Sequence, residues 1–396
     1  MSSKNTHLTH IEDRILTDGI DGANEAIDML KMMGDFLDGT PAAQPLVTEK
    51  WDGAPAVICG IDPLDNQFFV GTKSVFAKTA PKVCKSEADI DRFYSGVLAN
   101  KLKAAFKYLN GKVFGVLQGD LMFTDDKRYE RIEGKQYITF RPNTLTYGAE
   151  QGTPLGQQIE RAQLGIVFHT KYTGNSLAEM RAGFNITRQD FQSDQNVWAQ
   201  PAVYQDISGA ANMTRIERTK YDAAIRRAEG SLKQCRSILT KIQSGKKTLM
   251  TDTELLKFFN NYVKVGRDIP SVNQAYNDFM YHMGAEVDKV LQKKTSTVTQ
   301  EKYALKFLST IAFMEENEQQ FKMMIALYMN IQYCKNILVR QLQKVQALRV
   351  FANMGDKYVV TAPEGYVAVK GDRAVKLIDR LDFSRLNFTI PKEWDK

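Results

Sequence analysis

Thr48-Glu49-Lys50-Trp51-Asp52-Gly53-Ala54-Pro55 places a lysine, an aspartate and a glycine together at the end of an extended segment. The stretch follows the apolar pair Leu46-Val47 and precedes Ala56-Val57-Ile58, so it is predicted to join two strands. A lysine in this setting is either a surface charge beside a turn or a nucleophile held against a phosphate. What the rest of the chain places nearby decides between the two.

The composition is that of a globular protein with an anionic partner. The chain has 396 residues, of which 43% are hydrophobic and 25% charged, so we expect two domains and no wholesale disorder. The net charge of +7 suits binding to nucleic acid or to nucleotide phosphates. No apolar run reaches membrane length and the N-terminus has no signal core, which favours a cytoplasmic protein, in the host cell if it is phage-encoded.

Several other chemistries find little support in the sequence. Cys59, Cys84, Cys235 and Cys334 are far apart, so they predict neither a zinc site nor a disulfide framework. The four histidines form no H-E-x-x-H motif, which argues against a zinc hydrolase. Ser244-Gly245-Lys246-Lys247-Thr248 lacks the upstream glycine of a phosphate-binding loop.

The spacing of apolar residues divides the chain into helical and strand-rich parts. Helical spacing occupies residues 1–40, and short apolar runs separated by turns fill residues 41–175. Helical spacing returns over residues 176–354, and short alternating runs resume over residues 355–396. We therefore predict an α+β fold in which 41–175 and 355–396 form one antiparallel-sheet domain and 176–354 form a helical accessory domain.

Three charged residues lie in or beside predicted strands. Asp120 interrupts the apolar run 113–123, where a carboxylate needs a partner or a metal unless it lies on an edge strand or in a turn. Glu364 directly precedes the strand Gly365-Tyr366-Val367. Lys376 stands among apolar neighbours in the next strand, so it needs an anion nearby unless that strand is an exposed edge.

In this order the short motifs resemble those of the covalent nucleotidyltransferase superfamily, the ATP-dependent polynucleotide ligases and capping enzymes, and most closely the phage-type RNA ligases. Lys50-Trp51-Asp52-Gly53 resembles the first motif of that family, and Gly71-Thr72-Lys73-Ser74 resembles the basic strand that follows it. Gly119-Asp120-Leu121 is similar to the third motif, where the family usually has glutamate. Glu364-Gly365-Tyr366-Val367 resembles the fourth motif and Lys376 the fifth.

The resemblance implies a ligase adenylation domain and an ATP-dependent RNA ligase. The amine of Lys50 would attack the α-phosphorus of ATP to form lysyl-AMP, and Lys376 would stabilise the developing charge. The AMP would then pass to a 5′-phosphate end, and a 3′-hydroxyl would displace it. Glu364 and Asp120 would hold Mg²⁺, and Phe168 would stack on the base. The residues implied to bind the nucleotide are Glu49, Asp52, Gly53, Lys73, Phe168 and Lys370.

Three departures from the family pattern leave alternatives open. Pro55 stands where many members carry arginine, the fifth motif has one lysine instead of a pair, and a long helical block separates Phe168 from Glu364. The alternatives are a DNA ligase, an mRNA capping guanylyltransferase, or a catalytically degenerate protein that binds nucleic acid. In the last case the basic residues between 215 and 241 would track a phosphate backbone instead of forming a solvated surface. The ligase hypothesis requires Lys50 and Lys376 to approach across a phosphate-sized gap.

Overall fold

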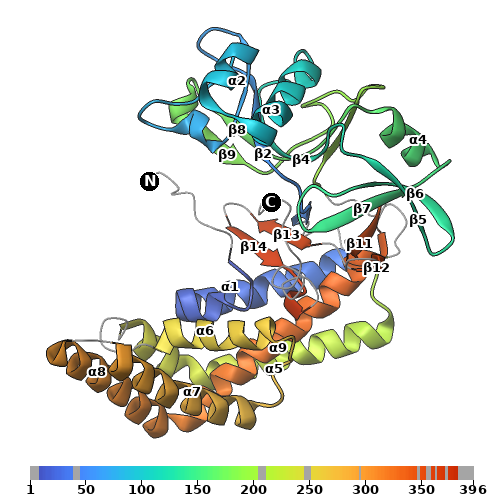
Figure 1. The fold of residues 1–396 in the computed structure, drawn as a ribbon. Helices are drawn as coiled ribbons and strands as arrows, with labels where there is room; N and C mark the ends of the chain where they lie inside the picture. Colours follow the sequence, from blue (N-terminus) through green and yellow to red (C-terminus); the bar gives the residue numbers. More distant parts are fainter. Residues whose placement is uncertain are drawn as a thin grey trace. The chain divides into compact units, whose positions relative to one another are not determined.

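The computed structural model describes residues 9–38, 45–203, 211–244, 251–293, 296–345, 348–353, 358–361, 364–370 and 373–381. These residues form helices and mainly antiparallel sheets (Figure 1), which confirms the α+β class. The chain divides into two compact units. We call them the helical unit, Met1–Pro45, Ser208–Lys344 and Lys370–Phe388, and the sheet unit, Leu46–Ile207, Val345–Val369 and Thr389–Lys396.

The bounds of the two units differ from the predicted domains in three places. Residues 1–40 do not stand apart, because the N-terminal helix packs within the helical unit. Strands continue beyond residue 175 as far as Pro201. Residues 370–388 belong to the helical unit, although their strand pattern assigned them to the sheet domain. The end of that predicted domain, 382–396, lies outside the described residues.

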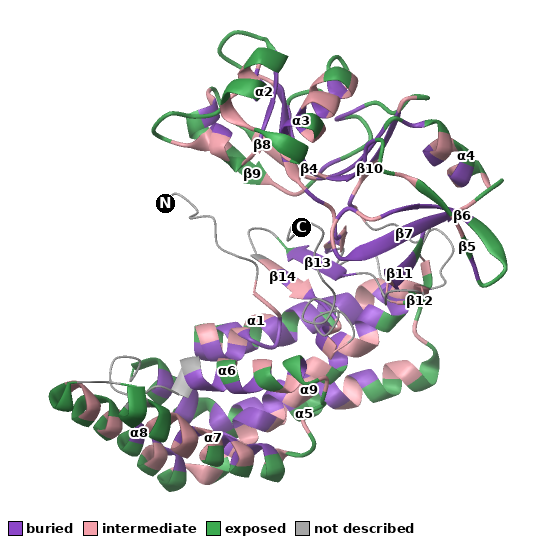
Figure 2. Cartoon of the chain, in the orientation of Figure 1, coloured by how far each residue is buried: buried purple, intermediate pink, exposed green. Residues whose placement is uncertain are grey.

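The helical unit is built around three long helices that pack along one another, α1, α5 and α9. Their facing sides carry buried apolar residues such as Leu30, Ile225 and Ile331, as the purple faces in Figure 2 show. The long helical pattern after residue 300 breaks at Asn317, as its length predicts. The elements are α1 (Arg14–Leu37), α5 (Arg215–Ser244), α6 (Thr251–Lys264), α7 (Val272–Lys293), α8 (Thr297–Glu316), α9 (Glu318–Leu342) and β14 (Arg373–Leu377).

The sheet unit contains two sheets and a further strand pair. The first sheet has the order β10-β8-β4-β2-β3, in which only β8 and β10 are parallel, and β9 pairs with β8. The second has the order β12-β11-β7-β6-β5, and β1 pairs antiparallel with β13. The strands of the sheet unit are β1 (Leu46–Lys50), β2 (Ala56–Ile61), β3 (Phe68–Gly71), β4 (Val116–Phe123), β5 (Arg128–Ile132), β6 (Lys135–Phe140), β7 (Leu145–Glu150), β8 (Leu164–Thr173), β9 (Arg181–Gly183), β10 (Val197–Pro201), β11 (Arg349–Asn353), β12 (Tyr358–Val360) and β13 (Gly365–Lys370).

Alternating side chains of the first sheet fill two cores. In β2, Val57 and Cys59 enter the larger core beneath α3, and Ile58 between them enters a smaller core on the other face. The short helices of this unit are α2 (Glu87–Phe93), α3 (Gly96–Leu109) and α4 (Pro154–Arg161), with 3₁₀ turns η1 (Lys73–Phe76) and η2 (Leu177–Glu179) and, at the unit boundary, η3 (Gln343–Val345).

No helix in the part of the chain that the structure describes is both long enough and apolar enough to cross a membrane.

Candidate functional site

The lysine of the opening motif meets a carboxylate from the far end of the chain. Lys50 is the last residue of β1 and pairs in register with Gly365, the first residue of β13. This register brings Glu364 beside Lys50, and the Lys50 Nζ donates to the Glu364 Oε1 across 314 residues of sequence. The Lys50 side chain is 30% exposed and that of Glu364 is 12% exposed. A ligand can therefore reach the amine, while the carboxylate is largely shielded.

Glu364 is a carboxyl that titrates near neutral pH. Burial is the main cause and raises its pKa from 4.5 to about 7, against the opposing effect of Lys50. The negative charges of Asp52 and Asp120 raise this pKa further. These influences identify Lys50, Glu364, Asp52 and Asp120 as one electrostatic group, which we call the Lys50 cluster. A carboxylate of this pKa that is hydrogen-bonded to an ammonium group is suited to take a proton from that group.

Asp52 is a positioning residue. Its carboxylate is buried and accepts hydrogen bonds from the Asn143 Nδ2 at 2.7 Å and from the backbone N–H groups of Thr144 at 2.7 Å and Leu145 at 2.8 Å. Burial raises the pKa of Asp52, and these hydrogen bonds act in the opposite direction. The Asp52 backbone N–H donates to the Tyr147 hydroxyl at 2.7 Å. The segment after Lys50 is thereby tied to the start of β7.

Gly53 lets the same segment approach the strand that carries Asp120. A β-carbon at Gly53 would lie 2.5 Å from the Asp120 Cβ and 2.9 Å from the Met122 Sδ, which leaves no room for a side chain. The Ala54 N–H donates to the Leu121 carbonyl at 2.9 Å and secures this approach. The glycine of the motif is therefore required by close packing against β4.

Asp120 reaches the Lys50 cluster from the middle of the first sheet. It pairs with Ala56 of β2 and Val167 of β8, so it is not on an edge strand. Its Oδ1 lies 3.6 Å from the Nε2 of His169, whose Nδ1 is 2.8 Å from the Thr170 hydroxyl. Its partly exposed side chain explains how β4 tolerates a carboxylate there.

Glu49 borders a cavity of about 990 Å³ in the sheet unit. Side chains of successive residues in a strand point to opposite faces, so the side chains of Glu49 and Lys50 lie on opposite faces of β1. Burial raises the pKa of Glu49 to about 7. Trp51 and Trp198 also line this cavity, with ring centroids 6.2 Å apart. Among the described residues, the buried Nε1 of Trp198 has no hydrogen-bond partner.

Two of the predicted nucleotide-binding residues lie elsewhere than expected. Phe168 is fully buried in the core of the first sheet, where its ring packs 5.0 Å from that of Phe191. This placement does not fit stacking on a base, because the inward face of β8 at Phe168 is covered. Lys73 is exposed in the 3₁₀ turn η1, because the chain leaves the sheet at Gly71 and the predicted basic strand does not form there.

The two remaining lysines lie toward the C-terminus. Lys370 is exposed at the end of β13. Lys376 lies in β14, where its backbone N–H donates to the Thr9 carbonyl at 3.1 Å and its carbonyl accepts from Ile11 at 3.3 Å. Lys376 belongs to the helical unit and Lys50 to the sheet unit. Their approach across a phosphate therefore stays a prediction.

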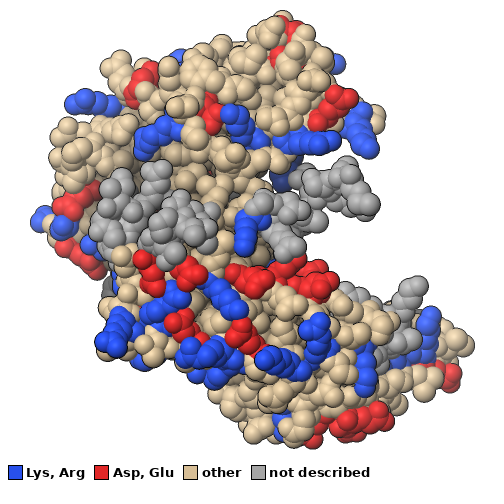
Figure 3. Space-filling view, turned by 180° about the vertical axis from the view of Figure 1, so that it is seen from behind, with Lys and Arg blue, Asp and Glu red and all other residues tan. Residues whose placement is uncertain are grey.

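One of the basic side chains of α5, that of Arg218, is neutralised by acids of α1, of the residue after it and of α5 itself. Arg218 forms ion pairs with Asp35, Asp38 and Asp222. On the face in Figure 3, lysine and arginine side chains are interspersed with acidic ones. This pattern favours a solvated surface over a continuous track for a phosphate backbone.

Sequence reasoning missed the residues that hold the site together. Asn143, Thr144 and Tyr147 anchor the motif, and His169 contacts Asp120, yet none of them stood out from its neighbours. The one available signal was His169 itself, a titratable residue directly after the apolar run Ile166-Val167-Phe168.

The donor set of the Lys50 cluster fits magnesium better than a transition metal. Among the described residues, no three histidine, cysteine, aspartate or glutamate side chains are grouped to hold a metal. Mg²⁺ usually needs only one or two carboxylates, because water and substrate phosphates complete its coordination. Glu364 and Asp120 are two such carboxylates, held in the same cluster.

Comparison with known proteins assigns the chain to a family but not to an activity. Residues 5–392 match the model of DUF6267, a family of unknown function, and the chain belongs to that family. No curated protein and no solved structure matches the chain.

Proposed function

We propose that this chain is an ATP-dependent RNA ligase with a nucleotidyltransferase fold, in which Lys50 carries AMP as a lysyl-adenylate. The observation that carries the proposal is the bond between the Lys50 amine and Glu364, in a cluster with Asp120. ATP as the nucleotide and RNA as the acceptor are inferred from the motifs around these residues, which resemble those of phage-type RNA ligases.

In the first step, Glu364 takes a proton from the Lys50 ammonium, because the pKa of Glu364 lies near neutrality and the two groups already share a hydrogen bond. The neutral amine attacks the α-phosphorus of ATP. A nitrogen–phosphorus bond forms, the bond to the bridging oxygen breaks, and pyrophosphate leaves. Asp52 and Gly53 hold the lysine in position through their contacts with β7 and β4.

Asp120 would hold Mg²⁺ during this first step, because Glu364 then carries the proton of Lys50, and the ion would offset charge on the phosphates. The base would lie in the cavity beside Glu49, where Trp51 offers a flat apolar surface. A protonated Glu49 would donate a hydrogen bond to it. Lys376, with Lys73 and Lys370 as helpers, would stabilise charge on the phosphates only if these side chains reach the Lys50 cluster.

In the second and third steps, the AMP passes to the 5′-phosphate of an RNA end, and a 3′-hydroxyl of a second end attacks that phosphate and releases AMP. The phosphodiester that forms replaces the phosphoanhydride that breaks, so the strand is sealed without a further energy source. RNA is proposed over DNA from the motif resemblance alone.

The test is covalent labelling with ATP that carries a radioactive α-phosphate, in the presence of magnesium. We expect label on the wild-type protein, none on Lys50→Ala, and undiminished label on Lys78→Ala, which removes an exposed lysine outside the cluster. Label from GTP in place of ATP would indicate a capping guanylyltransferase. Absence of label with either nucleotide would exclude the covalent mechanism and favour a protein that only binds nucleic acid.

The acceptor requires a second assay. Labelled protein should release its AMP to 5′-phosphorylated RNA and seal it to a 3′-hydroxyl end, and it should act more slowly on DNA of the same sequence. Faster transfer to DNA would replace RNA by DNA in the proposal without affecting the role of Lys50.

A further inference from the structure

The helical unit contains a second cavity, of about 600 Å³, that none of the proposed ligase steps uses. Residues from α6, from α7 and from the segments around His10 and Arg380 line it. All of these segments belong to the helical unit. The volume is sufficient for a nucleotide-sized group.

Two helices present polar side chains to this cavity along one side each. Lys257, Asn260, Asn261 and Lys264 line it from α6, at intervals of three, one and three residues that lie on one helical face. On α7 the lining residues are His282, Glu286 and Lys289, at intervals of four and three. The cavity is therefore built by two regular helix surfaces.

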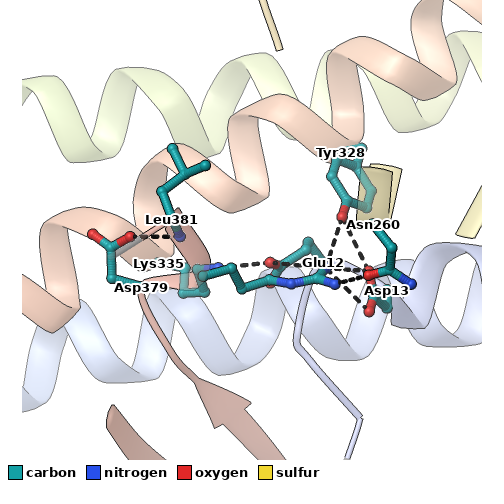
Figure 4. A network of polar contacts seen from close by, with 8 residues as sticks. Glu12, Asp13, Asn260, Tyr328, Lys335, Asp379 and Leu381 are labelled. Atoms are coloured by element: carbon teal, nitrogen blue, oxygen red, sulfur yellow. Dashed lines mark hydrogen bonds and ion pairs between the residues drawn. The ribbon is translucent and has the colours of Figure 1, made fainter. Parts of the chain in front are cut away.

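Arg380 forms a rigid basic floor. The residue is 6% exposed, and its Nη1 donates to the Asp13 Oδ1 at 3.1 Å, while its Nη2 donates to the Asn260 Oδ1. Asp13 also accepts from the Tyr328 hydroxyl at 3.0 Å (Figure 4). The buried Nε of Arg380 has no hydrogen-bond partner among the residues that the structure describes. A buried guanidinium donor without a partner is costly, so a ligand acceptor there would be favourable.

A neighbouring ion pair anchors the same floor. The Lys335 Nζ donates to the Glu12 Oε1 at 2.6 Å, and both side chains are fully buried (Figure 4). Burial lowers the pKa of His10 to about 3, so its ring is neutral at physiological pH. The His10 Nδ1 is a second buried nitrogen without a partner in the described part of the chain.

The lining carries more positive than negative charge. Four cations, Lys257, Lys264, Lys289 and Arg380, face one carboxylate, Glu286. Acids outside and inside the lining hold three of these cations in place and offset part of their charge: Lys257 pairs with Glu254, Lys289 with Glu286, and Arg380 with Asp13. Two asparagine amides add neutral donors. This combination of lysine, arginine and amide donors is suited to a compact, multiply charged oxyanion.

We propose that this cavity binds a phosphate monoester, supplied either by a free nucleotide or by the 5′ end of a nucleic acid. The phosphate oxygens would accept from Lys257 and Lys264 at the mouth, above the guanidinium of Arg380. The proposal stands apart from the ligase chemistry, because none of these residues belongs to the Lys50 cluster.

Binding is measured on the full chain carrying Lys50→Ala, so that the candidate site in the sheet unit does not form an adduct. The probes are AMP and a 5′-phosphorylated single-stranded oligonucleotide, each compared with its counterpart that lacks the phosphate. Lys257→Gln combined with Lys264→Gln removes two exposed cations from the mouth. The matched control is Lys293→Gln combined with Lys302→Gln, which removes two exposed lysines of α7 and α8 that do not line the cavity.

We expect the mouth variant to weaken binding of a phosphorylated probe at least tenfold, because each lost bond joins two charged groups. The counterpart without phosphate should be unaffected, as should both probes with the control variant. Tight binding of AMP identifies a free nucleotide as the ligand, and binding of the oligonucleotide alone identifies a nucleic-acid end. Equal weakening in the mouth and control variants, or no binding of either phosphorylated probe, would overturn the proposal.

The outcome is separable from that of the proposed ligase activity. Lys257→Gln with Lys264→Gln in an otherwise unchanged chain should still accept label on Lys50. Labelling of the unsubstituted chain without phosphate binding by the Lys50→Ala chain would contradict only the cavity, and phosphate binding without labelling would contradict only the ligase. Unchanged thermal unfolding of both double variants shows that the substitutions do not act through folding.

Discussion

Replacing Glu364 by glutamine should stabilise the protein above neutral pH and at the same time slow AMP transfer to Lys50. Both effects follow from one property, the burial of a carboxyl that must be ionised at pH 8. The carboxylate is costly to bury, yet it is the group that accepts the proton of Lys50 in the proposed reaction.

The magnitude follows from the pKa of Glu364, which folding raises from 4.5 to about 7. The folded chain binds the proton of the Glu364 carboxyl more tightly than the unfolded chain does. The free energy of unfolding therefore falls as the pH rises from 4.5 to 7, and it stays at the lower value above pH 7. At about 1.4 kcal/mol per pH unit, the wild type loses about 3 kcal/mol over this range. Glutamine resembles the protonated carboxyl and removes that loss, and the pKa of about 7 already includes the opposing effect of the ion pair with Lys50. We therefore expect a net gain of about 3 kcal/mol at pH 8 and a small change at pH 4.5.

The assay is urea unfolding at both pH values, together with covalent labelling at pH 8. Glu133→Gln, an exposed substitution in the same unit, is the matched control and should change neither measurement. A Glu364→Gln variant with the pH dependence of the wild type would show that the carboxyl is not buried as described. Labelling at the wild-type rate would refute its role as the proton acceptor.

Two further substitutions test the packing of each unit. Gly53→Ala should cost about 1–3 kcal/mol in urea unfolding, because its β-carbon would meet Asp120 at 2.5 Å. Gly230→Ala, in α5 with open space around it, should instead stabilise the protein by about 0.5–1 kcal/mol. If both substitutions changed the free energy of unfolding in the same direction, the close approach at Gly53 would be contradicted. Lys335→Met should cost about 3–5 kcal/mol, because it leaves Glu12 buried without its partner. Adding Glu12→Gln should recover most of that loss, and no recovery would contradict the pair.

Local patterns predicted the elements well where they depend on neighbours in sequence. The alternation of Val57, Ile58 and Cys59 matches the two cores on either side of β2. The turn expected after Ile61 forms because the Asp62 carboxylate accepts from the Leu64 N–H at 3.1 Å. These features are encoded within a few residues, and a single sequence is sufficient to find them.

Predictions that required knowing which face is covered were less successful. Phe168 was expected to stack on a base, but the core of the first sheet covers it. A strand's alternation indicates two faces without saying which one the rest of the chain covers. Residues 370–388 carry a strand pattern yet belong to the helical unit, because the contacts that decide their place come from distant segments.

The sequence by itself placed Lys50, Asp52 and Gly53 in one motif and identified Asp120 as a carboxylate that needs a partner inside a buried strand. Only the tertiary structure decided which groups these residues meet. The register between β1 and β13 delivers Glu364 to Lys50, and the backbone at the start of β7 satisfies Asp52. The reason is physical. A charged residue in an apolar run can be recognised from its neighbours in sequence, but the group that compensates its charge is brought to it by strand pairing and burial, which join residues hundreds of positions apart.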